Sequence, residues 1–162
     1  MTKQNKKNES TYPAQYETEV LLKDGSSILL RPIRLDDARS WVKFVGELSA
    51  RTKYLRFHYM PEELGLEDAV RFCTVDYRDT FAFVAEVLGK AKQDIVAIGR
   101  YYRLPDSHSA EVALAIEDKY QGRGLGTNLL EQLAGAARAN GIDRFQADVL
   151  DRKSTRLNSS HT

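Results

Sequence analysis

Cysteine is almost absent from this chain of 162 residues, in which Cys73 is the single example. One cysteine cannot form an internal disulfide, so we expect a protein of a reducing compartment, the cytoplasm. No apolar run approaches the length of a membrane span, and the N-terminus shows no signal-peptide core. We interpret Cys73 as a small buried apolar residue, because no motif places a histidine beside it as in a nucleophilic site.

A charge excess of one sign is missing as well. Lysine plus arginine total 24 and aspartate plus glutamate total 23, which gives a net charge of +1. This balance does not favour nucleic acid as a partner. Neither His58 nor His108 has a second ligand at metal spacing, so we predict no metal site. A composition of 42% hydrophobic and 29% charged residues suits one domain with a moderate core.

The most informative stretch is 111–140, which predicts a strand, a glycine-rich turn and a helix. Residues 111–117 carry apolar side chains on both faces, a pattern typical of a strand in the middle of a sheet. From about Gly124, leucines recur at helical spacing. The helix is expected to end at Gly141, because glycine adopts the left-handed conformation of a helix end without strain.

The turn between this strand and helix is predicted to bind an anion. Gly122, Gly124 and Gly126 remove Cβ atoms at alternate positions, which leaves backbone N–H groups accessible beside the positive end of a helix. Arg123 can add a charge. Thr127 stands where the dinucleotide-binding motif has its third glycine, and no Gly-Lys-Ser/Thr ends the turn as in a Walker A loop. The spacing alone is equally consistent with a flexible turn.

Short strands and helices are predicted along the rest of the chain. Asp24 and Gly25 separate two extended runs, as in a hairpin, and Pro32 is expected to end the second run. Asp36 or Asp37 is a candidate N-cap for the next helix. The predicted strands are 19–22, 27–33, 80–88, 94–104 and 142–150; the predicted helices are 38–48, a second from Ser49 to about Phe57, and 67–73.

A family resemblance rests on Gln121, Gly124 and Gly126, which follow a Leu-x-Ile strand. They resemble the acyl-CoA pyrophosphate loop of the GNAT superfamily of N-acetyltransferases, and the match runs without a gap over 110–141. The order of the predicted elements also resembles the GNAT fold. The resemblance therefore implies an α/β (α+β) fold, with a mixed, mostly antiparallel sheet flanked by helices.

Further motifs resemble one branch of this superfamily, the catalytic domains of bacterial Pat-like protein lysine acetyltransferases. They include Asp24-Gly25, the segments 30–34 and 54–57, and Val75-Asp76-Tyr77. The resemblance implies transfer of an acetyl group from acetyl-CoA to a primary amine by direct attack, with a protein lysine as one candidate acceptor. It assigns the cofactor to Leu114, Ala115 and Ile116 of the strand and to Gln121, Gly122, Arg123, Gly124, Leu125, Gly126 and Thr127 of the turn.

Glu111 is the candidate general base. Strand alternation places it on one face with Ala113 and Ala115, whose small side chains leave room for a substrate or a water. The resemblance places a carboxylate there too. A lysine amine has a reference pKa of about 10.4, so it must lose a proton before it attacks. A solvated glutamate at the start of a strand is the alternative interpretation.

Both ends of the chain are expected to lie outside the domain, which we place at 12–151. Residues 1–11 are polar and lysine-rich, as in a disordered tail. Residues 152–162 have no apolar period and are interpreted as a non-native tail. The GNAT fold normally continues past the strand 142–150 into a helix and further strands, which we expect to be missing here. The resemblance places the usual general acid, a tyrosine, in that missing part.

Alternative functions remain open at this point. A non-catalytic acyl-CoA-binding regulatory module would need the glycine turn but not Glu111. An enzyme for small-molecule amines would keep the same machinery with another acceptor. Tyr101 and Tyr102 at the end of the strand 94–104 are assigned to sheet packing, although one of them is an alternative candidate for the lining of a groove.

Overall fold

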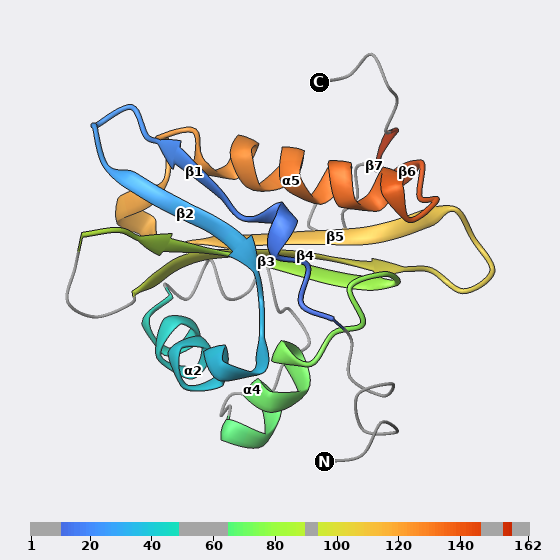
Figure 1. Cartoon of the computed structure of the whole chain (residues 1–162), viewed down its shortest axis with the longest axis horizontal. Coiled ribbons are helices and arrows are strands. Elements are labelled where there is room, and N and C mark those ends of the chain that lie inside the picture. Colours follow the sequence, from blue (N-terminus) through green and yellow to red (C-terminus); the bar gives the residue numbers. More distant parts are fainter. Residues whose placement is uncertain (1–10, 49–64, 90–93, 147–153, 157–162) are drawn as a thin grey trace.

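Seven strands form one sheet, in which they lie side by side in chain order (Figure 1). The computed structural model describes residues 11–48, 65–89, 94–146 and 154–156. Neighbouring strands are antiparallel except for β5 and β6, so the predicted mixed, mostly antiparallel sheet is confirmed. The strands are β1 Thr18–Leu21, β2 Ser27–Pro32, β3 Thr80–Val87, β4 Ile95–Arg103, β5 Ser109–Ile116, β6 Arg144–Gln146 and β7 Ser154–Arg156.

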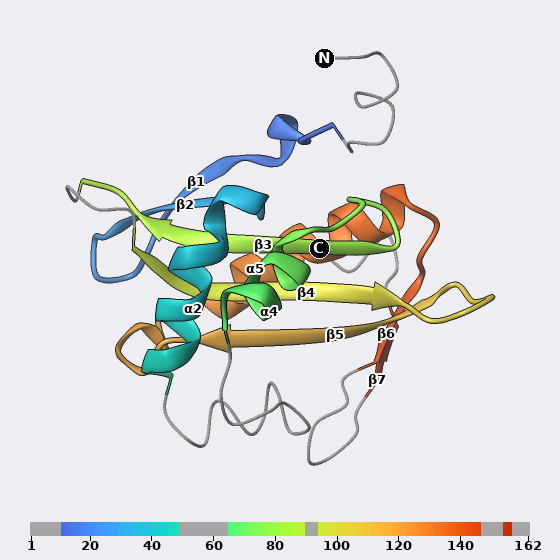
Figure 2. The ribbon, with the colours of Figure 1, turned by 90° about the horizontal axis from the view of Figure 1, so that it is seen from below.

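Helices cover both faces of the sheet (Figures 1 and 2). Helix α5, Leu125–Ala139, lies on one face, and helices α2, Ala38–Glu47, and α4, Leu66–Cys73, lie on the other. The predicted left-handed helix end is confirmed, since Gly141 follows α5 with φ +81°. Three short 3-10 turns complete the described elements: η1 Ala14–Tyr16, η2 Leu35–Asp37 and η3 Asp118–Tyr120.

The two faces of β5 contact different cores, as its alternation predicts. Val112, Leu114 and Ile116 pack against the core shared with α5. Ala115 is buried on the opposite face, in the core formed with α2 and α4. Cys73 is also buried in that second core, and burial raises the pKa of its thiol to about 12, so its interpretation as a packing residue is confirmed.

A buried arginine of β2 links this strand to β3 and to the turn before α2. Arg31 of β2 donates to Asp37 at 2.9 and 2.7 Å and to Glu86 of β3 at 2.9 Å. The predicted N-cap role of Asp37 is therefore wrong in its detail. Asp37 does precede α2, but its side chain accepts from Arg31 and from the amide of Arg34 instead of capping that helix. Asp37 binds Arg31 because an unpaired buried guanidinium costs more free energy than an uncapped helix end.

The hairpin at Asp24 and Gly25 is confirmed. Gly25 has φ +92°, and Asp24 accepts a hydrogen bond of 2.9 Å from the amide of Ser26. The expected helix from Ser49 to Phe57, the tail up to residue 10 and the strand residues 147–150 lie outside the described residues. Strand β7 was not predicted, because a three-residue strand without apolar alternation carries no local signal.

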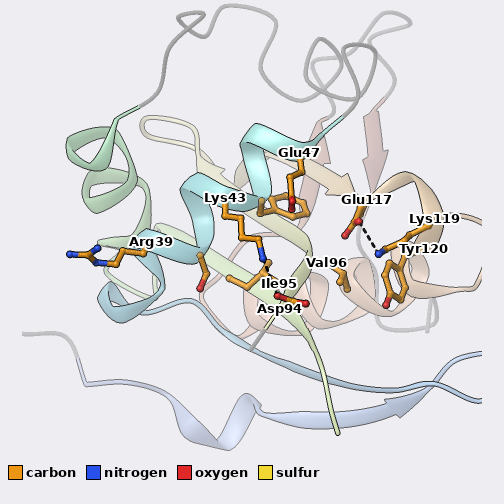
Figure 3. Close-up of a pocket in the computed structure, with 11 residues that line it drawn as sticks. Arg39, Lys43, Glu47, Asp94, Ile95, Val96, Glu117, Lys119 and Tyr120 are labelled. Carbon is orange, nitrogen blue, oxygen red and sulfur yellow. Dashed lines mark hydrogen bonds and ion pairs between the residues drawn. The ribbon is translucent and has the colours of Figure 1, made fainter. Parts of the chain in front are cut away.

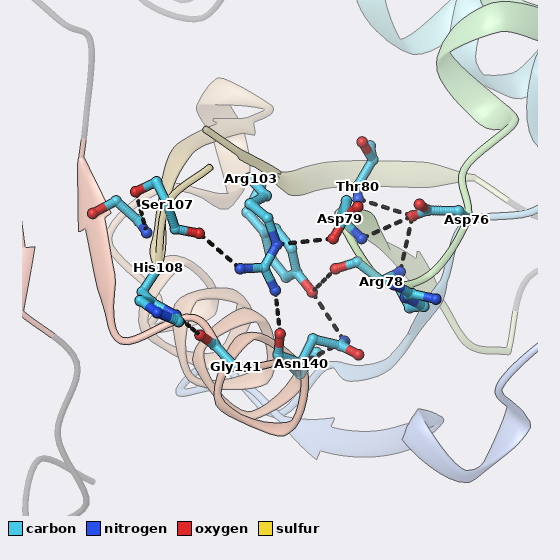
Figure 4. A network of polar contacts seen from close by, with 12 residues as sticks. Asp76, Arg78, Asp79, Thr80, Arg103, Ser107, His108, Asn140 and Gly141 are labelled. Carbon is cyan, nitrogen blue, oxygen red and sulfur yellow. Dashed lines mark hydrogen bonds and ion pairs between the residues drawn. The ribbon is translucent and has the colours of Figure 1, made fainter. Parts of the chain in front are cut away.

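The C-terminal end of α5 is held by a side chain of the sheet, as Figure 4 shows. Arg103 of β4 donates to the carbonyl of Asn140, to Asp79 at 2.8 Å and to the carbonyl of Ser107 at 2.9 Å. The last carbonyls of a helix have no partner within it, so a cation there satisfies them and complements the helix dipole. This contact fixes one end of α5, and the packing of the helix on the sheet fixes the rest.

Helix α5 approaches β4 closely at Gly99. A Cβ atom at this position would lie 2.7 Å from Cδ2 of Leu114 and 3.0 Å from Cδ1 of Leu133. Real carbon atoms do not come so near, and both leucines are packed in the core around α5. Gly99 therefore allows Leu114 and Leu133 to pack closely between α5 and the sheet.

We predict that Gly99→Ala lowers the free energy of unfolding by about 1–3 kcal/mol, because the added methyl group overpacks this contact. The measurement is urea denaturation followed by circular dichroism. Gly135→Ala is the matched control: nothing lies within 4 Å of a Cβ at that position of α5, so the change should stabilise by about 0.5–1 kcal/mol. Equal stability of Gly99→Ala and the unchanged chain would show that α5 does not need this glycine.

Candidate active site

Among the residues that the structure describes, the edge of β5 that faces away from β4 has no strand partner over most of its length. In the described chain β5 pairs with β6 only at Ser109, Ala110 and Glu111. The amide of Glu117 donates to Val96 of β4 at 2.9 Å. Because backbone groups alternate along a strand, the odd-numbered residues of β5 direct their N–H and C=O groups toward β4 and the even-numbered ones away from it.

Leu114 and Ile116 consequently present backbone groups to the open edge. Gln121 occupies one of these groups, since its side-chain amide donates to the carbonyl of Ile116 at 2.9 Å and to Asp118 at 3.3 Å. The other groups, including both N–H donors, have no strand partner among the described residues. An extended ligand with amide groups can add to such an edge as another strand would.

The glycine turn leads from this edge into the N-terminus of α5. Gly122 and Gly124 have φ values of +78° and +92°, a region that other residues enter only with strain. Gly124 is the N-cap of α5, and the first turn has neither a capping side chain nor an acidic residue. The donors of that turn are thus left for an external acceptor, which is the arrangement that binds phosphate groups.

The neighbouring residues of the turn hold it against the sheet. Leu125 is buried, whereas Thr127 is exposed. A Cβ atom at Gly126 would lie 3.2 Å from Cδ1 of Ile116. The absence of a side chain at Gly126 therefore allows the first turn of α5 to sit directly on the end of β5.

Arg123 brings the predicted positive charge to the turn, but it already has a partner there. It forms an ion pair with Asp24 of the β1–β2 hairpin, and its guanidinium lies 5.3 Å from the centre of the Tyr120 ring. Hydrogen bonds from Ser26 and the nearby Arg123 lower the pKa of Asp24. An anion bound at the turn has to compete with this carboxylate for Arg123.

Glu111 lies where β6 separates from β5. It shares the α2/α4 face with Ala113 and Ala115, and its partner across the sheet is Tyr102 of β4. Glu111 is half-buried, and its carboxylate makes no hydrogen bond or ion pair with the residues that the structure describes. By contrast, the carboxylate of Glu117 lies 3.5 Å from the ammonium group of Lys119. Of these two carboxylates, Glu111 is the one without a partner among the described residues.

A groove of about 500 Å³ lies beside the glycine turn, between α2, the start of β4 and the segment after β5 (Figure 3). Its charges are mixed, and Lys43 lies 3.5 Å from Asp94 across it. The sequence did not predict this groove, because its walls come from three segments that are far apart in the chain. The charged lining residues are Arg39, Lys43, Glu47, Asp94, Glu117 and Lys119.

The described residues form neither a metal site nor a membrane-spanning helix. Histidine, cysteine, aspartate and glutamate side chains form no group there that could hold a metal ion. Within the same residues, no helix combines the length and the apolar character needed to span a bilayer. The features that remain are the open edge, the glycine turn, Glu111 and the groove.

Comparison with known proteins gives a consistent family. The chain matches the acetyltransferase (GNAT) family over residues 43–157. It is 34% identical to acetyltransferase PA5475 of Pseudomonas aeruginosa over 121 residues, which cover 75% of this chain and 65% of that protein. It is also 34% identical to acetyltransferase Pat of Mycolicibacterium smegmatis over 136 residues, 81% of this chain and 39% of that protein. The chain thus spans less than two thirds of either curated relative.

A solved structure agrees with this match in fold as well as in sequence. The GNAT domain of PAT from S. lividans has a TM-score of 0.77 and 37% identity, with 86% of this chain and 82% of that domain covered. The predicted GNAT-type sheet flanked by helices is therefore confirmed.

We predict that Asp24→Asn strengthens the binding of acetyl-CoA roughly two- to fivefold, the range expected when one exposed ion pair no longer competes for Arg123. Asparagine keeps an oxygen that can accept from Ser26, so the hairpin persists. Titration calorimetry measures the effect, with Asp143→Asn, an exposed carboxylate beyond the other end of α5, as control. The gain should shrink at about 1 M salt. Weaker binding by Asp24→Asn would mean that Asp24 supports the anion site instead of competing with it.

Proposed function

The chain belongs to the acetyltransferase (GNAT) family, and from that premise we propose that it transfers an acetyl group from acetyl-CoA to a primary amine. The observation that carries the proposal is the continuity of two features: an open strand edge at Leu114 and Ile116, and an uncapped helix N-terminus at Gly124. The first suits the amides of an extended arm and the second suits phosphates. Acetyl-CoA carries both kinds of group in one molecule.

Acetyl-CoA would bind with its pyrophosphate at the turn formed by residues 121–127. The N–H groups of the first turn of α5 would donate to it, with the helix dipole adding to the attraction. Arg123 would leave its ion pair with Asp24 and bind the phosphates instead. The pantetheine arm would follow β5 and pair with the backbone of Leu114 and Ile116, while Ala115 between them faces the other core.

The reaction needs a proton acceptor and a donor for the developing negative charge. Acetyl-CoA supplies the thioester that the amine attacks. Glu111 would take the proton from the acceptor ammonium group, directly or through a water, because its carboxylate has no competing partner among the described residues. A backbone N–H of the open edge, at Leu114 or Ile116, would stabilise the charge on the thioester oxygen.

A protein lysine is the acceptor that we favour. The support is the similarity to the Pat-type domains, over both sequence and fold. We place the reaction in the cytoplasm, in keeping with the single, buried cysteine.

We predict that Glu111→Gln lowers kcat/KM for a lysine peptide by about 10²–10³-fold, because the general base is lost. Its affinity for acetyl-CoA should not change. The residual rate should rise with pH toward the amine pKa of about 10.4, since the amine must then lose its proton unaided. Initial rates from pH 6 to 10 and calorimetry with acetyl-CoA test both statements.

Glu117→Gln is the matched control, since this carboxylate follows the same strand but is paired with Lys119. It should retain most of the activity. Full activity of Glu111→Gln would remove Glu111 from the mechanism. Saturable acetyl-CoA binding without transfer to any amine would favour the non-catalytic, acyl-CoA-binding alternative.

We further predict that Gly124→Trp abolishes acetyl-CoA binding while the fold persists. The indole would occupy the space where the phosphates lie, which is open in this structure. Because the change also strains a left-handed residue, Gly89→Trp serves as the control: Gly89 has φ +87° and equally open surroundings in the β3–β4 turn. Calorimetry and circular dichroism should show two folded variants, of which only Gly89→Trp binds. Normal binding by Gly124→Trp would place the phosphates elsewhere.

A further inference from the structure

A second buried arginine lies next to the proposed acceptor side. Arg100 of β4 is 2% exposed and faces the α2/α4 core. It donates to the carbonyl of Phe72 and to the hydroxyl of Tyr102 at 2.8 Å, and it lies over both rings, 5.0 and 5.5 Å from their centres. None of these partners is a carboxylate. The buried Nε of Arg100 has no hydrogen-bond partner among the described residues.

Only one of these contacts has a purely structural explanation. Phe72 belongs to the last turn of α4, where carbonyl groups lack partners within the helix, so a cation is favourable there. The hydrogen bond from Arg100 to Tyr102 does not satisfy a carbonyl group at a helix end. Instead it fixes the position of a phenol on the face of the sheet that carries Glu111.

Tyr102 and Glu111 are direct partners across β4 and β5. Side chains of such a pair start about 5 Å apart on the same face. The hydroxyl of Tyr102 accepts from Arg100, which leaves its own hydrogen and a second lone pair unused among the described residues. Its neighbour Tyr101 differs: it is fully buried on the other face, where it donates to the carbonyl of Arg78 at 2.7 Å and accepts from Asn140 at 3.2 Å.

We propose that Tyr102 is a binding residue for the acceptor amine, held in place by Arg100 as a positioning residue. This inference rests on the proposed function and adds a second polar contact to it. Glu111 takes one proton of the ammonium group, and the free lone pair of Tyr102 accepts an N–H of the neutral amine. The amine nitrogen then directs its own lone pair to the thioester carbonyl carbon.

The step is balanced within these groups. A C–N bond forms between the amine and the acetyl carbon, and the C–S bond breaks, so that coenzyme A leaves as a thiolate. The proton that Glu111 accepted from the ammonium group passes to solvent. Once the C–N bond has formed, the nitrogen loses a second proton, which also passes to solvent, and the thiolate takes up one proton from solvent. Tyr102 neither gains nor loses a proton, which distinguishes its role from that of Glu111.

Tyr102→Phe tests the inference, because it removes the hydroxyl and keeps the ring over Arg100. The probe is a blocked peptide with one lysine. We expect the KM for the peptide to rise about five- to tenfold, as for the loss of one hydrogen bond. The kcat should stay within about twofold, since the same bond is lost in the ground and transition states. The affinity for acetyl-CoA and the shape of the pH profile should not change.

Tyr101→Phe is the matched control on the same strand. It should lower the melting temperature, because a buried bond is lost, and leave the KM for the peptide unchanged. A double-mutant cycle with Arg100→Lys then tests the positioning role: if Arg100 acts through Tyr102, it adds no further rise in KM to Tyr102→Phe. Weaker acetyl-CoA binding or an unchanged KM in Tyr102→Phe would overturn the inference alone. A wild-type chain that acetylates neither the peptide nor any other primary amine would overturn the proposed function as well.

Discussion

The close packing of α5 on β4 and β5 is the constraint on which the rest of the site depends. A side chain at position 99 would have to displace the methyl ends of Leu114 and Leu133. With α5 held at this distance, its first turn meets the end of β5, and a second small residue, Gly126, is needed there. The strand, the glycine turn and the helix N-terminus are therefore packed together, and this packing sets the direction of the N–H groups that have no partner among the described residues.

Strand β5 divides the proposed chemistry between the two faces of the sheet and its edge. Even-numbered side chains pack under α5, and the backbone of the same residues is directed to the open edge. Odd-numbered side chains face α2 and α4, where Glu111 lies opposite Tyr102. In the proposed reaction, one short strand would therefore present the acetyl carrier at its edge and the acceptor on one face.

The sequence predicted the parts of this arrangement that depend on local pattern. Three predicted elements depend on patterns within a few residues, and the structure confirms each of them. They are the strand β5, the glycine turn and the helix after Gly124. Contacts between distant segments were not predicted. Arg123 and Asp24 are 99 residues apart, and Asp37 turns to Arg31 instead of capping α2. Such pairings depend on which charges the tertiary structure brings together, and no spacing rule contains that information.

The length of β5 favours a long ligand with different chemical groups at its two ends. Along β5, Glu111 and Ile116 are about 17 Å apart at the usual rise of a strand. The glycine turn lies beyond Ile116, and the carboxylate of Glu111, which has no partner among the described residues, lies at the other end. A small phosphorylated substrate would fill the turn and leave Glu111 without a partner. A molecule that uses both must carry phosphates, an extended arm with amides and a reactive group at its far end, which is the constitution of acetyl-CoA.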